Sequence, residues 1–409
     1  MCYNKRIKAR QPREGGESRL MKIVDLRSTL TNSNDVLIQN DGVHIYYAEE
    51  KIIEGKRNLF LLDYDRSTRE ERVLSDHCLL NPRYVMHYFS FPEHILVVME
   101  DGGSEAWFLR VEKSGGGEEI LQPVYFAGNY AACCALDCRH VLLYSTENPR
   151  DATLFREYRR QTGFTRAAYL CDVQTGQCWS VQDPRVCAGA GLLPYTGGGE
   201  QKLLVLQPYG TEEEKRKAYR DRRWLSGSVT DQIWICALPA FIDAVEAGQA
   251  CAPMQRVLRA GTEGMVRFAA QDTNSLYFRA LYFPHDDQRI LAVNKHTGAK
   301  REAARLNLAP DEKDARFVID PEGRAYKMTA LDSRHMRVQG LLNSTADLSF
   351  DTNLGKFFAC FDDRYLLLRD EIRDETDSIV FYTLVDAKSG KAKNFEGSCA
   401  FQGDVLVVF

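Results

Sequence analysis

The sequence lacks a long apolar stretch: no segment reaches the ~18 consecutive apolar residues that a membrane-spanning helix needs. It also lacks a strong charge imbalance, since the formal net charge is −4 over 409 residues. A charge of this size indicates neither a nucleic-acid-binding protein nor one that attracts acidic substrates. No stretch rich in Pro, Gly and Ser divides the chain, so we expect a single domain in spite of its length.

The sequence patterns of several catalytic and metal sites are also missing. There is no G-x-S-x-G elbow, and the glycine turns at 196–200 and 261–264 lack the Lys-Ser/Thr ending of a phosphate loop. The eight histidines form no H-x-H or H-E-x-x-H pattern. The acidic hairpin tips at 286–288, 320–324 and 361–364 each offer at most two carboxylates, fewer than calcium requires. We therefore expect neither a cofactor nor a metal ion.

Cysteine is plentiful, with twelve residues, but its arrangement does not favour a metal site. Cys133, Cys134 and Cys138 with His140 resemble a zinc cluster. The first two are adjacent on a predicted strand, however, so their side chains point to opposite faces. We interpret them as buried strand cysteines. Because the first 20 residues contain no signal peptide, we expect a cytoplasmic protein whose cysteines are all thiols.

A turn signature recurs along the chain: an acidic or amide residue is followed three positions later by Ser or Thr, usually with Gly next. The copies are DVQTG from Asp172, NKHTG from Asn294 and DAKSG from Asp386, with looser ones at DRSTR from Asp65, VEKSG from Val111 and DLRST from Asp25. The Asp or Asn side chain bonds to backbone two residues on, and Gly takes the left-handed conformation of a bulged loop. Each copy follows a short β-type run, so the signature predicts a hairpin.

A second element lies between these signatures: an apolar run, a polar tip and another apolar run. Eight such hairpins are predicted, at 36–50, 84–101, 130–145, 192–207, 265–282, 315–331, 356–371 and 398–409. A candidate third strand follows each of the first seven, and a fourth follows most of them. Four antiparallel strands per unit, repeated every ~40–60 residues, predict an all-β protein with the blades of a β-propeller.

The two ends of the chain predict how the propeller closes. The last hairpin ends at Phe409 without a third strand, whereas 22–29 has the third-strand signature without a preceding hairpin. The simplest arrangement gives one blade an N-terminal strand and the C-terminal hairpin, which leaves no open sheet edge. Eight blades are then favoured over seven. The sixth is the weakest prediction, because 339–350 lacks the turn signature.

The propeller domain is expected to cover 21–409. Residues 1–20 are interpreted as a disordered tail or as a mis-assigned start. The second alternative rests on REGGES at 13–18, just before Met21, because purine-rich codons for it would resemble a bacterial ribosome-binding sequence.

Two neighbouring units carry insertions between their second and third strands, at 148–166 and 210–231. Because such connections emerge on one face of a propeller, we predict that the insertions form a basic, aromatic surface for an anionic partner. The alternative is that the aromatics pack each insertion onto its blade. The candidate binding residues are Arg156, Tyr158, Arg159, Arg160, Lys215, Arg216, Tyr219, Arg220, Arg223 and Trp224. A third helical segment, 239–249, belongs to the opposite face and is expected to pack.

In blade period, hairpin patterning and the D-x-x-[ST]-G turn, residues 22–409 resemble β-propeller proteins of the WD-repeat, TolB-like and quinoprotein-like kinds. The Trp-Asp strand ending of WD repeats and the repeated Trp of quinoprotein blades are absent, so no site residues are transferred from these families. The resemblance implies a rigid disc with two loop faces and a central channel.

Two functions are compatible with such a disc. The favoured one is a non-catalytic, monomeric scaffold that binds a ligand or another protein with an acidic segment, rather than nucleic acid. The alternative is an enzyme of the hydrolase or lyase type that works at the central channel. Its candidate residues lie at the ends of the predicted inner strands, at the channel mouth: Asn40, Asp320, Asp362 and Gln402.

Overall fold

A computed structural model describes the following residues: 22–25, 36–79, 84–101, 104–147, 152–164, 166–187, 191–208, 230–259, 264–282, 287–305, 315–320, 324–373, 378–396, 399–402 and 405–408. Within this part of the chain the strands form seven hydrogen-bonded sheets. No helix in it is long and apolar enough to cross a membrane.

The first four units follow one another along the chain. Unit 1 contains β2 (Val36–Asn40), β3 (His44–Ile53), β4 (Lys56–Asp65) and β5 (Glu70–Leu79). Unit 2 contains β6 (Tyr84–Ser90), β7 (His94–Glu100), β8 (Glu105–Glu112) and β9 (Glu118–Ile120), with β10 (Val124–Tyr125) also on β8. Unit 3 contains β11 (Asn129–Ala135), β12 (His140–Thr146), β13 (Ala167–Asp172) and β14 (Cys178–Ser180). Unit 4 contains β15 (Gly191–Gly197), β16 (Glu200–Pro208), β17 (Thr230–Ala237) and β18 (Gln255–Arg259).

Three further antiparallel units follow. Unit 5 contains β19 (Gly264–Gln271), β20 (Ser275–Tyr282), β21 (Asp287–Asn294) and β22 (Lys300–Arg305). Unit 6 contains β23 (Arg316–Ile319), β24 (Ala325–Ala330), β25 (His335–Leu342) and β26 (Asp347–Asp351), followed by the 3₁₀ helix η1 (Thr352–Leu354). Unit 7 contains β27 (Lys356–Phe361), β28 (Tyr365–Arg373), β29 (Ser378–Asp386) and β30 (Ala392–Glu396).

Unit 8, the last unit, joins the two ends of the chain, as the sequence predicts. β31 (Cys399–Gln402) and β32 (Val405–Val408) form an antiparallel hairpin, and β1 (Lys22–Asp25) pairs with β32. The pairing of β1 is parallel, with Lys22 opposite Val405, so this unit departs from the antiparallel rule. The looser turn copy from Asp25 extends beyond β1 and lies outside the described residues.

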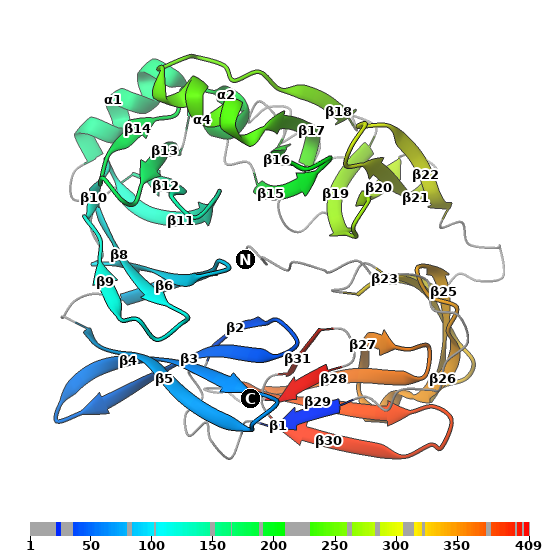
Figure 1. The fold of residues 1–409 in the computed structure, drawn as a ribbon. Coiled ribbons are helices and arrows are strands. Elements are labelled where there is room, and N and C mark those ends of the chain that lie inside the picture. The colour runs from blue at the N-terminus through cyan, green and yellow to red at the C-terminus, as the bar shows by residue number, and fades with distance from the viewer. Residues whose placement is uncertain are drawn as a thin grey trace.

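Hydrophobic clusters join each unit to the next. Each of eight clusters draws its buried side chains from two consecutive units, and the cluster of Ile45, Tyr47 and Val407 joins unit 8 to unit 1. The units therefore close into a ring, visible in Figure 1. The fold is a β-propeller. The sheets number seven and the units eight, because a single residue pair, Thr230 with Val266, merges units 4 and 5 into one sheet.

The recurring turn signature forms the hairpin between the third and fourth strands, as predicted. The backbone N–H of Gly176 donates to the carbonyl of Asp172 at 2.9 Å, and Gly298 and Gly390 repeat this bond in units 5 and 7. The three glycines have φ of 72°, 70° and 68°, in the left-handed region that favours glycine. In the looser copy DRSTR, Arg69 occupies the glycine position with φ 63°.

Among the described residues, three helices lie on units 3 and 4. α1 (Ala152–Thr162) lies between β12 and β13, and α2 (Pro184–Cys187) follows β14. α4 (Leu238–Glu246) connects β17 to β18 and buries Phe241 and Ile242 in the cluster between units 3 and 4. The packing role predicted for 239–249 is thus confirmed.

One pair of cysteines departs from the expectation that all are thiols. Cys171 on β13 lies directly opposite Cys178 on β14, and the two form a disulfide bond. The expectation is wrong for this pair, because a tight hairpin places their Cα atoms 4.3 Å apart. The predicted alternation of Cys133 and Cys134 is confirmed: Cys133 belongs to the cluster between units 2 and 3, and Cys134 to the one between units 3 and 4.

Candidate functional site

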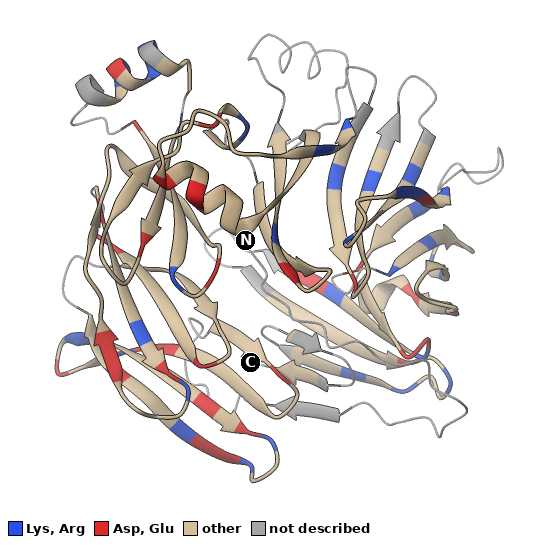
Figure 2. Cartoon of the chain, turned by 45° about the horizontal axis from the view of Figure 1, so that its top comes forward, with Lys and Arg blue, Asp and Glu red and all other residues tan. Residues whose placement is uncertain are grey.

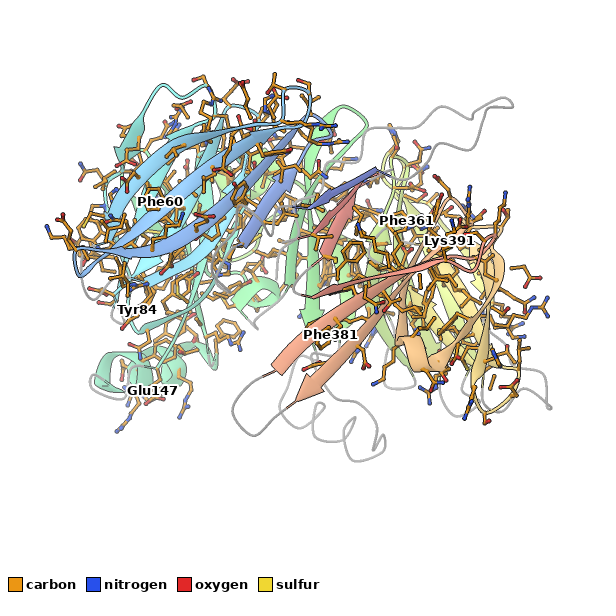
Figure 3. All side chains as sticks on the ribbon, turned by 90° about the horizontal axis from the view of Figure 1, so that it is seen from below. Phe60, Tyr84, Glu147, Phe361, Phe381 and Lys391 are labelled. Atoms are coloured by element: carbon orange, nitrogen blue, oxygen red, sulfur yellow. A yellow bond between two sulfur atoms is a disulfide. The ribbon has the colours of Figure 1, made fainter. Side chains whose placement is uncertain are left out.

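The two loop faces of the propeller differ in what they carry. The connections between second and third strands include the long β3–β4 hairpin and α1. We call the face of the propeller that carries these connections the insertion face. Figure 3 shows Tyr84, Glu147 and Phe381 toward this side of the molecule and Phe361 and Lys391 toward the other.

The aromatic residues of α1 pack the helix onto unit 3. Phe155 is buried, and its ring lies 5.6 Å from that of Tyr158. A Cβ atom on Gly128 would lie 3.0 Å from the Phe155 ring, so the loop before β11 approaches the helix closely. Burial raises the pKa of Tyr158 well above its ordinary value. These contacts support the alternative in which the aromatics serve packing.

The arginines of α1 remain at the surface but have acidic neighbours. Arg156 and Arg159 lie 3.3 and 3.7 Å from the carboxylate of Glu147, and Arg160 lies 2.8 Å from that of Glu157. The side chains of Arg156 and Arg160 are 70% and 78% exposed. Such exposed pairs contribute little to folding, so the guanidinium groups stay available to a partner. The predicted docking role of these residues is not tested by this geometry.

The second half of the predicted basic surface lies outside the described residues. It comprises Lys215, Arg216, Tyr219, Arg220, Arg223 and Trp224.

The four predicted channel-mouth residues all lie where an inner strand ends, but two of them are held by their own hairpins. Asn40 Oδ1 accepts a hydrogen bond from the backbone N–H of Gly42 at 3.0 Å. The buried carboxylate of Asp320 accepts bonds from the backbone N–H and Nε of Arg324 at 3.0 and 2.7 Å. Asp362 is exposed and has φ 44°, and Gln402 ends β31. A site formed by these four residues stays a prediction.

The cysteine and histidine group of unit 3 is dispersed. His140 Nδ1 lies 2.9 Å from the carboxylate of Asp137, in its own hairpin. Among the described residues, no three potential metal ligands come together.

A group of exposed apolar side chains on the insertion face of units 1 and 2 was not predicted from the sequence. We call it the apolar rim; it consists of Val36, Ile52, Ile53, Tyr84 and Met86. Ile52, at the tip of the β3–β4 hairpin, is 77% exposed, and Tyr84, at the start of β6, is 50% exposed. The guanidinium of Arg57, opposite Ile52 in the hairpin, lies 5.4 Å from the Tyr84 ring. The two isoleucines beside a polar hairpin tip were the available signal in the sequence.

No family model matches the sequence, and no curated protein matches it. Among solved structures, the chain is similar to oligogalacturonate lyase from Vibrio parahaemolyticus, with 11% identity, 91% of this chain and 82% of that chain covered, and a TM-score of 0.41. It is also similar to the β-propeller domain of the Trilobed protease from Pyrococcus furiosus, with 9% identity, coverage of 90% and 94%, and a TM-score of 0.42. TolB from Acinetobacter baumannii gives 10% identity, coverage of 89% and 82%, and a TM-score of 0.31. The chain is a β-propeller protein, by its own sheet order and ring of clusters, and no specific family is identified for it.

Proposed function

We propose that the protein is a non-catalytic scaffold that binds a partner protein on the insertion face of units 1 to 3. The observation that carries this proposal is the apolar rim. Most large apolar side chains of the described residues are buried, and five of the eleven exposed ones lie at one end of two neighbouring units. Grouped exposed apolar side chains mark interaction sites, and Tyr, Met and Arg are enriched in such interfaces.

The charges on the same face suggest the chemistry of the partner. Arg156, Arg159 and Arg160 of α1 lie on the insertion face, one unit beyond Tyr84. A partner that combines an apolar anchor with an acidic segment fits both features, since charges at the edge of an interface steer association. The monomeric state and the cytoplasmic location expected from the sequence stay predictions.

Two of the four channel-mouth candidates, Asp320 and Asn40, favour a scaffold over an enzyme. A catalytic carboxylate needs oxygens that reach a substrate, but both Asp320 oxygens bind groups of their own hairpin. The Asn40 side-chain oxygen caps its turn in the same way.

Affinity capture from cells of the native organism tests the proposal. The double variant Ile52→Ser and Tyr84→Ser removes the centre of the apolar rim. Ile120→Ser is the matched control, because Ile120 is equally exposed, at 50%, but lies on the outer strand β9. We expect the double variant to lose the captured partner and the control to retain it, with both melting close to wild type. Retention of the partner by the double variant would refute the proposed surface.

A further inference from the structure

The repeat allows equivalent positions of the eight unit junctions to be compared. On each second strand, one side chain near the middle faces the preceding unit and the next one faces the following unit. Six junctions pair apolar residues at these positions. The pairs are Ala48 with Val97, Val98 with Leu143, Tyr144 with Val205, Leu206 with Phe278, Met328 with Leu368, and Val407 with Tyr47, each within one cluster or packed against it.

The junction between units 5 and 6 has cations at these positions. Arg279 on β20 takes the forward-facing position, and Lys327 on β24 takes the backward-facing one. Their orientation follows from the strand register. Arg279 lies opposite Ile290, and Lys327 lies opposite Phe317, and both partners belong to the cluster between units 5 and 6.

A third cation lies beside Arg279. Arg267 on β19 is directly opposite Arg279, so both guanidinium groups extend from the same face of the sheet. Like charges directly across an antiparallel pair are destabilising unless something compensates them. Lys and Arg recur on neighbouring strands of unit 5 in Figure 2.

The surroundings of these cations are apolar, and five of the residues there are alanines. The cluster between units 5 and 6 contains Ala292 and Ala325, with Ala269, Ala303 and Ala304 packed against it. Alanine leaves room for long side chains in the junction. Arg267, Arg279 and Lys327 are all partly buried there.

Arg279 donates a hydrogen bond to a neutral group. Its Nη2 donates to Oε1 of Gln288 at 2.5 Å. Burial, and then the charge of Arg267, lower the pKa of Arg279. In unit 7, Arg369 holds the equivalent position but has Glu371 at 3.4 Å as an ion-pair partner. Arg279 is therefore a half-buried cation whose hydrogen bond goes to a neutral amide, and such a group is suited to bind an anion.

We propose that Arg267, Arg279 and Lys327 form a binding site for a small multivalent oxyanion between units 5 and 6. Guanidinium groups bind phosphate and carboxylate in bidentate fashion, and lysine adds a point charge. A cluster of cationic side chains suits a ligand with more than one negative charge, such as a phosphate monoester or a polycarboxylate. The site is separate from the apolar rim, so it goes beyond the proposed scaffold function.

Isothermal titration of the full chain with inorganic phosphate, and separately with citrate, tests the site at constant ionic strength. We expect saturable binding of at least one of the two, and the stronger one identifies the ligand class. Arg279→Gln should weaken that binding at least ~10-fold, since a charge-assisted hydrogen bond is lost. Arg289→Gln is the control: Arg289 lies opposite Ala280, on the face of the same sheet that meets unit 4, and should leave binding unchanged.

Lys327→Gln provides a second variant in the neighbouring sheet, in case Arg279→Gln does not fold. Lys327→Gln should also weaken anion binding, as Arg279→Gln does. The proposal is overturned if neither anion binds the wild-type protein. It is also overturned if both variants bind as tightly as wild type, or if Arg289→Gln weakens binding to the same extent.

Discussion

The carboxylate of Asp363 in unit 7 accepts a hydrogen bond from the backbone N–H of Thr345 in unit 6 at 2.9 Å, and its other oxygen accepts one from Ser344 Oγ at 2.7 Å. Ser344 and Thr345 belong to the hairpin between β25 and β26, which lacks the turn signature found in other units. A neighbouring unit thus supplies the acidic group that the turn itself does not contain.

Asp363→Asn should therefore lower the free energy of unfolding by about 1–2 kcal/mol, because the amide keeps only one acceptor oxygen. Asn tolerates the left-handed φ of 49° at this position, so backbone strain is not added. Asp362→Asn is the control, since Asp362 is adjacent and exposed and has a similar φ. Urea denaturation of the three proteins measures the difference. Equal losses in the two variants would contradict the role of Asp363.

The ion pair of Arg139 and Asp172 should make stability depend on pH. Arg139 Nε donates to Asp172 Oδ2 at 2.9 Å. Burial acts to raise the pKa of Asp172, but hydrogen bonds from Arg139 and the turn lower it to about 2, from an ordinary value of 3.8. Because the folded pKa is depressed, the stabilisation is present above about pH 4 and is lost as the pH falls toward 2.

Asp172→Asn should accordingly cost about 1.5–3 kcal/mol at pH 7 and progressively less as the pH falls from 4 to 2.5. Urea denaturation of wild type and variant across this range gives the comparison. A difference that stays constant with pH would show that the pair contributes no charge-dependent stability.

The turn position held by Arg69 predicts a stabilising substitution. A non-glycine residue in the left-handed region is strained by ~1 kcal/mol or more, and Arg69 is exposed, with φ 63°. Arg69→Gly should raise the free energy of unfolding by about 0.5 kcal/mol, since part of the relieved strain is offset by unfolded-chain entropy.

Gly390→Ala makes the reverse change at the equivalent turn position of unit 7. Gly390 has φ 68°, and a Cβ there meets nothing within 4 Å, so only backbone strain is added. This variant should lose about 1 kcal/mol. If both substitutions shift the thermal melt in the same direction, backbone conformation is not what distinguishes the two turns.

Closure by β1 predicts a difference between two truncations. Deleting residues 1–20 leaves β1 intact, whereas deleting 1–30 removes it and exposes the edge of β32. We expect the longer truncation to have a clearly lower melting temperature and a greater tendency to aggregate, and the shorter one to melt close to wild type. Indistinguishable melts would show that the parallel pairing contributes nothing to stability.

The sequence was sufficient for those features whose physical cause is local. The turn at Asp172 could be predicted because its side chain and Gly176 bond within five consecutive residues. The alternation of Cys133 and Cys134 followed from the strand period alone. The pairing of the first and last strands could be inferred because each end lacked what the other supplied, although the parallel direction of β1 could not.

Other features depend on which units become neighbours, and only the tertiary structure decides them. Asp363 caps the turn at Thr345 because two sheets pack side by side. Arg279 and Lys327 are far apart in the sequence, and neither has a local pattern that marks it. Strand register and the order of units in the ring place both residues in one junction. Burial there strengthens electrostatic interactions, so two residue types that usually lie at the surface form a candidate anion site.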